Sequence, residues 1–181
     1  MAARIVIISG ACGTGKTSIA HLLAKNSTYP YAVHLHTDDF YQYIQKGYTA
    51  PWSDASGDQN ETVIDAVVAS TKKFSEGGYE VYVDGVIGPW FLAPWVKLAE
   101  EGFDIRYIVL RPDEETTISR AFERTQRDYF PLNRDDIKNV WSSLSDLDKY
   151  EANVVDTTAQ TIDESMVYIQ KMLQRNTFCI L

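Results

Sequence analysis

A glycine-rich turn between an apolar run and a helical pattern constrains the fold of this chain more than any other feature. The apolar run "RIVIIS" covers residues 4–9, and the turn "GACGTGKTS" follows it directly, from Gly10 to Ser18. A short run that is almost wholly apolar predicts a strand buried on both faces, as in a parallel sheet. The residues from about Lys16 to Lys25 predict a helix. This strand–turn–helix unit therefore has its most flexible backbone at the junction.

Short apolar runs and longer helical patterns alternate along the rest of the chain, which is typical of an α/β fold with a parallel sheet. Further strands are predicted at residues 31–36, 79–85, within 103–113 and at 152–156. Helices are predicted near residues 60–76, 114–128, 135–148 and 161–175. No repeat, low-complexity segment or linker interrupts this pattern. We therefore predict a single domain over residues 1–181, a three-layer α/β fold with a five-stranded parallel sheet.

The composition argues against several classes of function. The formal net charge is −8, which disfavours broad binding to nucleic acid or to an anionic membrane surface. The apolar runs are far shorter than the roughly 20 residues of a membrane span, and the N-terminus has no secretory pattern. Cys12 and Cys179 lie at opposite ends of the chain and form no disulfide framework, which favours a reducing, cytoplasmic location. The oligomeric state is left open.

The turn matches the pattern G-x-x-x-x-G-K-[ST], the P-loop or Walker A motif. Its glycines let backbone N–H groups surround a phosphate, and the helix that begins at Lys16 points its positive end at the same anion. Lys16 would reach the β- and γ-phosphates, and the Thr17 hydroxyl would bind Mg²⁺. A chance match is the alternative, but the strand before the turn and the helix after it favour a P-loop.

The P-loop predicts ATP and Mg²⁺ as cofactors. The residues expected to bind the nucleotide are Gly10, Ala11, Cys12, Gly13, Thr14, Gly15, Lys16, Thr17 and Ser18.

The stretch "HTDDFYQ" after the second predicted strand resembles the small P-loop kinases. Uridine kinase and nicotinamide riboside kinase have a similar Asp-x-Phe-Tyr/Phe stretch there, and shikimate kinase, gluconate kinase and chloramphenicol phosphotransferase keep an acidic residue nearby. The resemblance implies the αβα P-loop fold with strand order 2-3-1-4-5. It also implies an acceptor-binding subregion near residues 40–60 and a lid near 120–134.

By this resemblance Asp38 is the carboxylate that binds the acceptor, and Asp39 is its neighbour. Phosphoryl transfer needs such a carboxylate to receive the proton of the nucleophile. The alternative is that one of the two aspartates only caps the following helix. His34, His36 and Asp38 alternate on one strand face, but a fourth ligand is missing, so solvent-facing or locally bonded histidines are favoured over a metal site.

The predicted strand "EVYVDG" resembles a Walker B strand that ends in Asp84. This resemblance places Asp84 beside the P-loop, where it would help Thr17 to orient Mg²⁺. The alternative is an aspartate that only makes the turn before a glycine.

Three arginines after the fourth predicted strand share one helical stripe: Arg120, Arg124 and Arg127. The region resembles the kinase lid, whose arginines neutralise the phosphate in transfer. Arg120 and Arg124 are the preferred catalytic candidates. Glu123 lies four residues before Arg127, so a solvated ion-pair surface is the rival interpretation.

Aromatic residues gather in two stretches after the second and third predicted strands. They are Phe40, Tyr41, Tyr43, Tyr48 and Trp52, together with the segment "GVIGPWFLAPW" at 85–95. These rings would either line a pocket for a flat or sugar-like molecule or fill the core. A nucleoside monophosphate is disfavoured as acceptor, because residues 40–75 contain only Lys46, Lys72 and Lys73 as basic groups.

The segment "VVDTTAQTIDE" at 154–164 resembles the adenine-binding segment of such kinases, although a threonine cap before a helix explains it equally well.

Taken together, the sequence predicts a kinase with Lys16, Asp38, Arg120 and Arg124 as catalytic residues. Thr17 and Asp84 are its magnesium ligands, and a nucleoside-, sugar- or antibiotic-like molecule is its acceptor. The second class of function is a nucleotide-binding regulatory or switch protein with little or no acceptor phosphorylation.

Overall fold

The computed structural model describes residues 2–125 and 133–181. It contains one parallel sheet with the order β2-β3-β1-β4-β5, as the resemblance implies. The strands are β1 (Ile5–Gly10), β2 (Ala32–His36), β3 (Glu80–Gly85), β4 (Ile105–Leu110) and β5 (Val154–Val155). Every residue of β1, β3 and β4 is buried, because helices cover both faces of the sheet.

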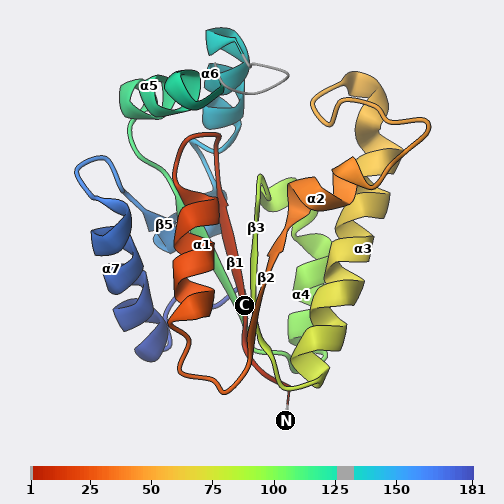
Figure 1. Ribbon diagram of the computed structural model, residues 1–181, viewed down its shortest axis with the longest axis vertical. Helices are drawn as coiled ribbons and strands as arrows, with labels where there is room; N and C mark the ends of the chain where they lie inside the picture. Colours follow the sequence, from red (N-terminus) through yellow and green to blue (C-terminus); the bar gives the residue numbers. More distant parts are fainter. Residues whose placement is uncertain (1, 126–132) are drawn as a thin grey trace.

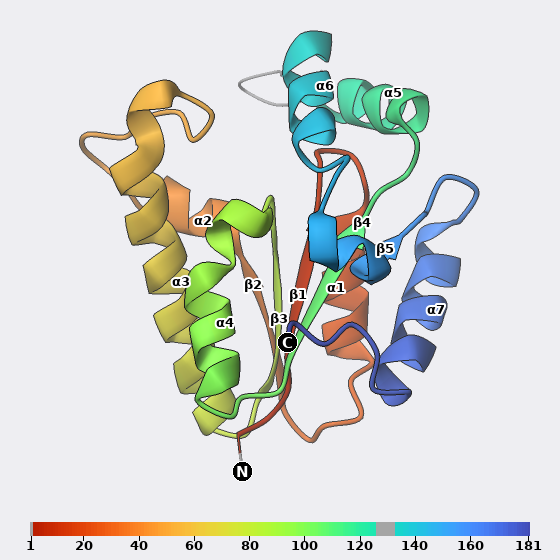
Figure 2. The same cartoon turned by 180° about the vertical axis from the view of Figure 1, so that it is seen from behind.

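Two helical layers enclose this sheet (Figures 1 and 2). The helices α1 (Lys16–Lys25) and α7 (Ile162–Gln174) cover one face, where Ile19 and Ile169 pack against Val6 and Ile8. The helices α3 (Gly57–Glu76) and α4 (Ala93–Glu100) cover the other face. Strand residues point alternately to the two faces, so even-numbered residues of β1 and β3 pack toward α1.

Three more helices lie at the end of the sheet where the strands finish. Helix α2 (Thr37–Gln42) follows β2 directly, and α5 (Glu114–Thr125) and α6 (Arg134–Ser143) follow β4. Both views place α5 and α6 beyond the turn between β1 and α1 (Figures 1 and 2). The candidate functional residues at the ends of β1, β2 and β3 therefore meet in one place.

Most predicted elements are present, with corrections at a few boundaries. Helix α3 begins at Gly57 rather than near residue 60, and α6 ends at Ser143, after which a 3₁₀ turn covers Asp148–Asn153. Helix α4 was not predicted, because the segment at 85–95 is rich in aromatic residues and contains Pro94. Proline is tolerated in the first turn of a helix, where its missing N–H has no partner to lose. Pro94 lies in that turn of α4.

No helix within the described residues has the length and apolar character needed to cross a membrane.

Candidate active site

The P-loop has the backbone that its glycines were expected to provide. Gly13 and Gly15 have φ values of 82° and 89°, in a region that favours glycine. Helix α1 begins at Lys16 directly after Gly15, and no described side chain caps its first N–H groups. Those N–H groups and the positive end of the helix dipole therefore remain available to an anion.

The loop also packs closely against its neighbours. A Cβ atom at Gly13 would lie 2.5 Å from the backbone nitrogen of Ala121 in α5, and one at Gly10 would lie 2.6 Å from the carbonyl oxygen of Leu110 in β4. Contacts this short exclude any side chain at these positions. The glycines thus serve packing as well as backbone conformation.

Lys16 is held inside the loop. Its side chain is nearly buried, with 6% of the residue exposed, and its Nζ donates a hydrogen bond to the carbonyl oxygen of Ala11 at 3.4 Å. The Thr14 hydroxyl donates to the same oxygen at 3.0 Å. The ammonium group thus lies over the curled backbone, where it would contact a phosphate bound by the loop.

Thr17 of α1 and Asp84 of β3 are in contact, as the Walker B resemblance implied. The Thr17 hydroxyl donates to Oδ2 of Asp84 at 2.6 Å, and Asp84 is fully buried at the end of β3. The parallel register pairs Asp84 with Ile8, two residues before the P-loop. Two hard oxygen donors in contact suit Mg²⁺, which prefers carboxylate and hydroxyl ligands.

Two histidines of β2 also bind this carboxylate. Nε2 of His34 lies 2.6 Å from Oδ1 of Asp84, and Nδ1 of His36 lies 3.1 Å from the same atom. Burial by itself raises the pKa of Asp84, but hydrogen bonds from the two histidines and Thr17 outweigh it and hold the pKa below its usual range. The carboxylate is therefore ionised at neutral pH.

These histidine contacts were not predicted from the sequence. The expectation that these histidines are hydrogen-bonded within the protein is correct. Their partner, however, is not a residue nearby in the sequence but Asp84 in the neighbouring strand. The β2–β3 register pairs His36 with Asp84 and His34 with Tyr82, and so places both histidines on the α1 face beside Asp84. No group of three or more metal-binding side chains is found within the residues that the structure describes.

Asp38 lies in the first turn of α2 and is exposed. Nε2 of His36 lies 3.4 Å from its Oδ2, so His36 stands between the carboxylates of Asp38 and Asp84. The hydrogen bond from His36 lowers the pKa of Asp38, and the charge of Lys16 lowers it further. Hydrogen bonds to Asp38 and then Asp84 raise the pKa of His36 to about 10, so this imidazole is charged at neutral pH.

Neither aspartate caps α2. The N-cap residue is His36, and no side-chain cap bond is formed there, which contradicts the alternative that Asp38 is only a cap. Asp39 is exposed and lines a cavity of about 650 Å³ beside the P-loop. The other lining residues are Thr17, Ser18, His21, Leu22, His34 and His36.

The expected lid residues are described only in part. Arg120 donates hydrogen bonds to the carbonyl oxygens of Thr157 and Thr158 at 3.4 and 3.2 Å, and so ties α5 to the segment after β5. Arg127 and the side chain of Arg124 lie outside the described residues. Thr161 caps α7 in a capping box with Glu164, so the threonine-cap interpretation of 154–164 is correct.

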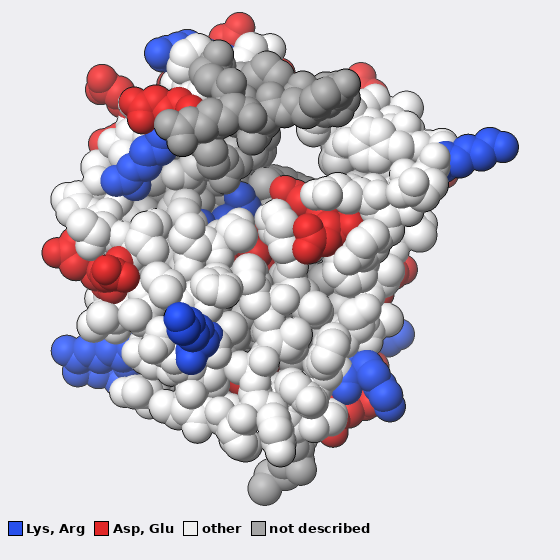
Figure 3. Space-filling view, viewed as in Figure 1, with Lys and Arg blue, Asp and Glu red and all other residues white. Residues whose placement is uncertain are grey.

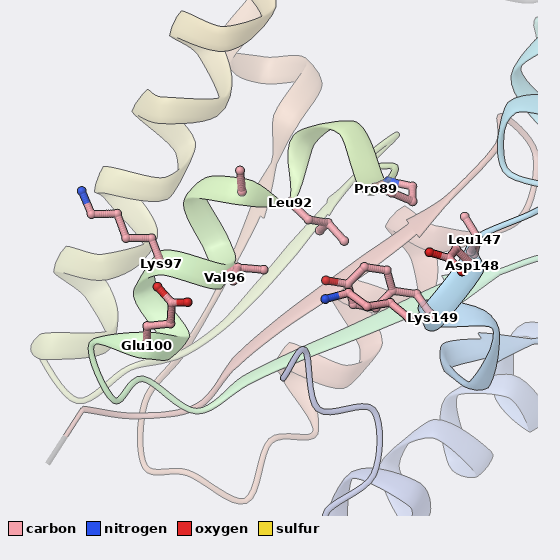
Figure 4. A pocket seen from close by; sticks show the side chains of 10 residues that line it. Pro89, Leu92, Val96, Lys97, Glu100, Leu147, Asp148 and Lys149 are labelled. Carbon is pink, nitrogen blue, oxygen red and sulfur yellow. The ribbon is translucent and has the colours of Figure 1, made fainter.

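The aromatic residues divide between core and surface. Trp95 is fully buried against the sheet, and Phe40 and Tyr41 are partly buried. Within the two aromatic stretches, four rings are exposed: Tyr43, Tyr48, Trp52 and Trp90. A smaller cavity of about 420 Å³ lies between α4 and the 3₁₀ turn at 148–153, on the sheet face away from α1 (Figure 4).

The model of the AAA domain family matches residues 6–139, which include the P-loop, α2 and Asp84. This chain belongs to the AAA domain family. No curated protein sequence matches this AAA-domain chain.

Solved structures resemble the AAA-domain chain over nearly its whole length. The Mycobacterium tuberculosis APS kinase CysC in complex with AMPPNP and APS is 17% identical with a TM-score of 0.68, covering 96% of this chain and 98% of that one. The Deinococcus radiodurans tunicamycin resistance protein is 17% identical with a TM-score of 0.65, covering 94% and 95%. Shikimate kinase from Acinetobacter baumannii in complex with shikimate is 16% identical with a TM-score of 0.62, covering 97% and 95%. The predicted three-layer αβα P-loop fold is therefore confirmed.

Proposed function

We propose that this chain is an ATP- and Mg²⁺-dependent kinase that transfers the γ-phosphate to a hydroxyl group of a small molecule. One observation carries the proposal. The Thr17 hydroxyl bonded to the buried Asp84, the Lys16 ammonium and the exposed Asp38 carboxylate lie at the same end of the sheet. The likeness in fold to an APS kinase and a shikimate kinase supports it.

The nucleotide side of the site is formed by backbone and by Lys16. The free N–H groups of the loop and of the first turn of α1 would bind the β- and γ-phosphates, and Lys16 would exchange its bond to the Ala11 carbonyl for one to a phosphate oxygen. Thr17 and Asp84 would hold Mg²⁺, which would neutralise charge on the phosphates. Asp84 suits this role because its pKa is lowered.

The transfer step needs a group that accepts one proton. The acceptor oxygen would form a bond to the γ-phosphorus as the bond from that phosphorus to the bridging oxygen breaks, which releases ADP. The hydroxyl proton would pass to the ionised carboxylate of Asp38. Arg120 and Arg124 would approach the transferred phosphoryl group from the lid at 120–134 and help to exclude water.

The acceptor is expected against the subregion at 40–60, which adjoins Asp38. Figure 3 shows that the molecule is hollowed between this side and the end that carries α5 and α6, with acidic side chains beside the hollow. Nucleoside-, sugar- and antibiotic-like alcohols all fit the proposed reaction.

A coupled assay of ADP release over a panel of nucleosides, sugars and antibiotic-like alcohols tests this proposal. We expect release that depends on an acceptor and on Mg²⁺, and that is absent in Lys16→Ala. Asp38→Asn should retain ATP affinity and lose about 10²-fold or more in turnover. Equally slow ADP formation with and without every acceptor would instead support a regulatory or switch protein.

A further inference from the structure

The segment from α2 to the start of α3 is acidic and exposed. Residues 37–60 contain a single basic residue, Lys46, and four aspartates: Asp38, Asp39, Asp54 and Asp58. All five side chains are exposed. An anionic acceptor that approached Asp38 would therefore meet like charge on the element that has to bind it.

The loop between α2 and α3, residues 43–56, is held by two side chains of α3. Gln59 donates to the carbonyl oxygen of Thr49 at 2.7 Å and accepts from the Thr49 nitrogen at 2.8 Å. The Asn60 amide donates to the carbonyl oxygen of Pro51 at 2.8 Å and to the Ser56 hydroxyl at 2.9 Å. These paired bonds fix the backbone of the loop, so that its side chains form a preformed surface.

That surface presents aromatic rings to solvent. Tyr43, Tyr48 and Trp52 are 71%, 52% and 64% exposed, although large aromatic residues normally bury most of their area. An ordinary polar loop does not expose three aromatic rings to solvent. A surface that binds planar or pyranose rings does expose them.

Tyr41 connects these rings to the proposed catalytic carboxylate. Its hydroxyl donates to Oδ1 of Asn60 at 3.0 Å. Burial, together with the charge of Asp38, raises the pKa of Tyr41 to about 12. Tyr41 lies three residues after Asp38 in α2, and Asn60 also binds the carbonyl oxygen of Pro51, the residue before Trp52. A ring stacked on this loop would therefore lie beside the element that carries Asp38.

We infer that the acceptor is a ring-bearing alcohol without anionic groups, stacked on Tyr48 and Trp52 and selected against negative charge by Asp54 and Asp58. The inference rests on the proposed kinase function and narrows its substrate class. A cationic amine on the ring is compatible with the surface, whereas a carboxylate, sulfate or phosphate is not.

Acceptor pairs that keep every hydroxyl group test the charge selection. Uridine is compared with orotidine, and glucosamine with N-sulfoglucosamine, alongside the best acceptor of the ADP-release panel and an anionic derivative of it. We expect kcat/KM for the anionic member of each accepted pair to be lower by about tenfold or more. The double variant Asp54→Asn/Asp58→Asn should reduce this difference, because it removes the negative charges and keeps side chains of nearly the same size.

Ring variants test the stacking. Tyr48→Ala and Trp52→Ala should raise KM for the acceptor by about tenfold and leave KM for ATP unchanged. Tyr48→Phe and Trp52→Phe, which keep an aromatic ring, should leave KM for the acceptor close to that of wild type. Tyr31→Ala is the matched control, because Tyr31 is equally exposed but precedes β2 at the opposite end of the sheet.

The outcomes separate the two proposals. An anionic or acyclic best acceptor, or an acceptor KM that neither ring variant changes, would overturn the inference and leave the kinase function intact. Absence of acceptor-dependent ADP release with every compound would overturn the kinase function, and the inference with it.

Discussion

Three side chains donate hydrogen bonds to the buried carboxylate of Asp84: Thr17, His34 and His36. A buried carboxylate without such partners would be protonated or would destabilise the fold. These partners belong to α1 and β2, so the Asp84 side chain connects both of these elements to β3. His36 also extends the contact to Asp38. The same residues would thus contribute to stability and to the reaction.

The charge of His36 predicts how the stability of the folded protein depends on pH. Its pKa is about 10 in the folded protein and about 6.5 in an unfolded chain. A raised pKa stabilises the folded state fully below about pH 6.5, and that contribution is lost as the pH rises toward 10. His36→Gln should therefore lower the free energy of unfolding by ~2 kcal/mol at pH 6, and the difference from wild type should shrink by pH 10.

Urea denaturation between pH 6 and pH 10, in the absence of Mg²⁺, measures this difference. His21→Gln is the control, because His21 is exposed on α1 and its replacement should change the free energy of unfolding little at any of these pH values. If the free energies of unfolding of wild type and His36→Gln differ by the same amount from pH 6 to pH 10, His36 is not held in its charged form between Asp38 and Asp84.

At the scale of elements, the contact between the P-loop and α5 determines the shape of the proposed nucleotide site. Gly13→Ala would place a Cβ 2.5 Å from the Ala121 nitrogen and so force the loop and α5 apart. We expect a loss of about 1–3 kcal/mol in the free energy of unfolding, beyond the cost of the positive φ, together with weaker binding of ATP.

Gly78→Ala provides the matched control. Its φ of 85° is close to the 82° of Gly13, but a Cβ there has no heavy atom within 4 Å. Chemical denaturation of both variants separates backbone strain from the clash with α5. Equal destabilisation by the two substitutions would show that the packing of the loop against α5 contributes nothing.

The elements that could be predicted from the sequence are those with a strong local pattern. The central strands are continuous apolar runs, and the P-loop has both a specific spacing and the correct context. Helix α4 could not be predicted, because Trp90, Phe91 and Trp95 obscure a 3.6-residue period in the segment that leads into it. Strand β5 is predicted too long, since only Val154 and Val155 pair with β4.

The candidate site could be predicted only where the motif determines the position. Lys16 and Thr17 follow from the P-loop, and the contact with Asp84 follows from strands that end at the same edge. The bonds of His34 and His36 depend on the register of β2 against β3, and 43 residues lie between these strands. The bonds of Arg120 to Thr157 and Thr158 depend on how α5 packs, which no local pattern encodes.

At the scale of the whole molecule, the proposed function requires an acidic protein to bind a polyanion. The net charge is −8, but distant carboxylates are screened over about 8–10 Å at physiological ionic strength. Groups in contact with the phosphates would decide the affinity: the amides of the P-loop, the dipole of α1 and the nearly buried Lys16. The account therefore depends on a local site that overcomes an unfavourable overall charge.

Calorimetric titration of the protein with ATP and Mg²⁺ measures this binding most directly. We expect one nucleotide to bind per chain with measurable heat, and Lys16→Ala to weaken the affinity by about a hundredfold. A wild-type titration without heat, or equal affinity in wild type and Lys16→Ala, would contradict a phosphate site built on this loop.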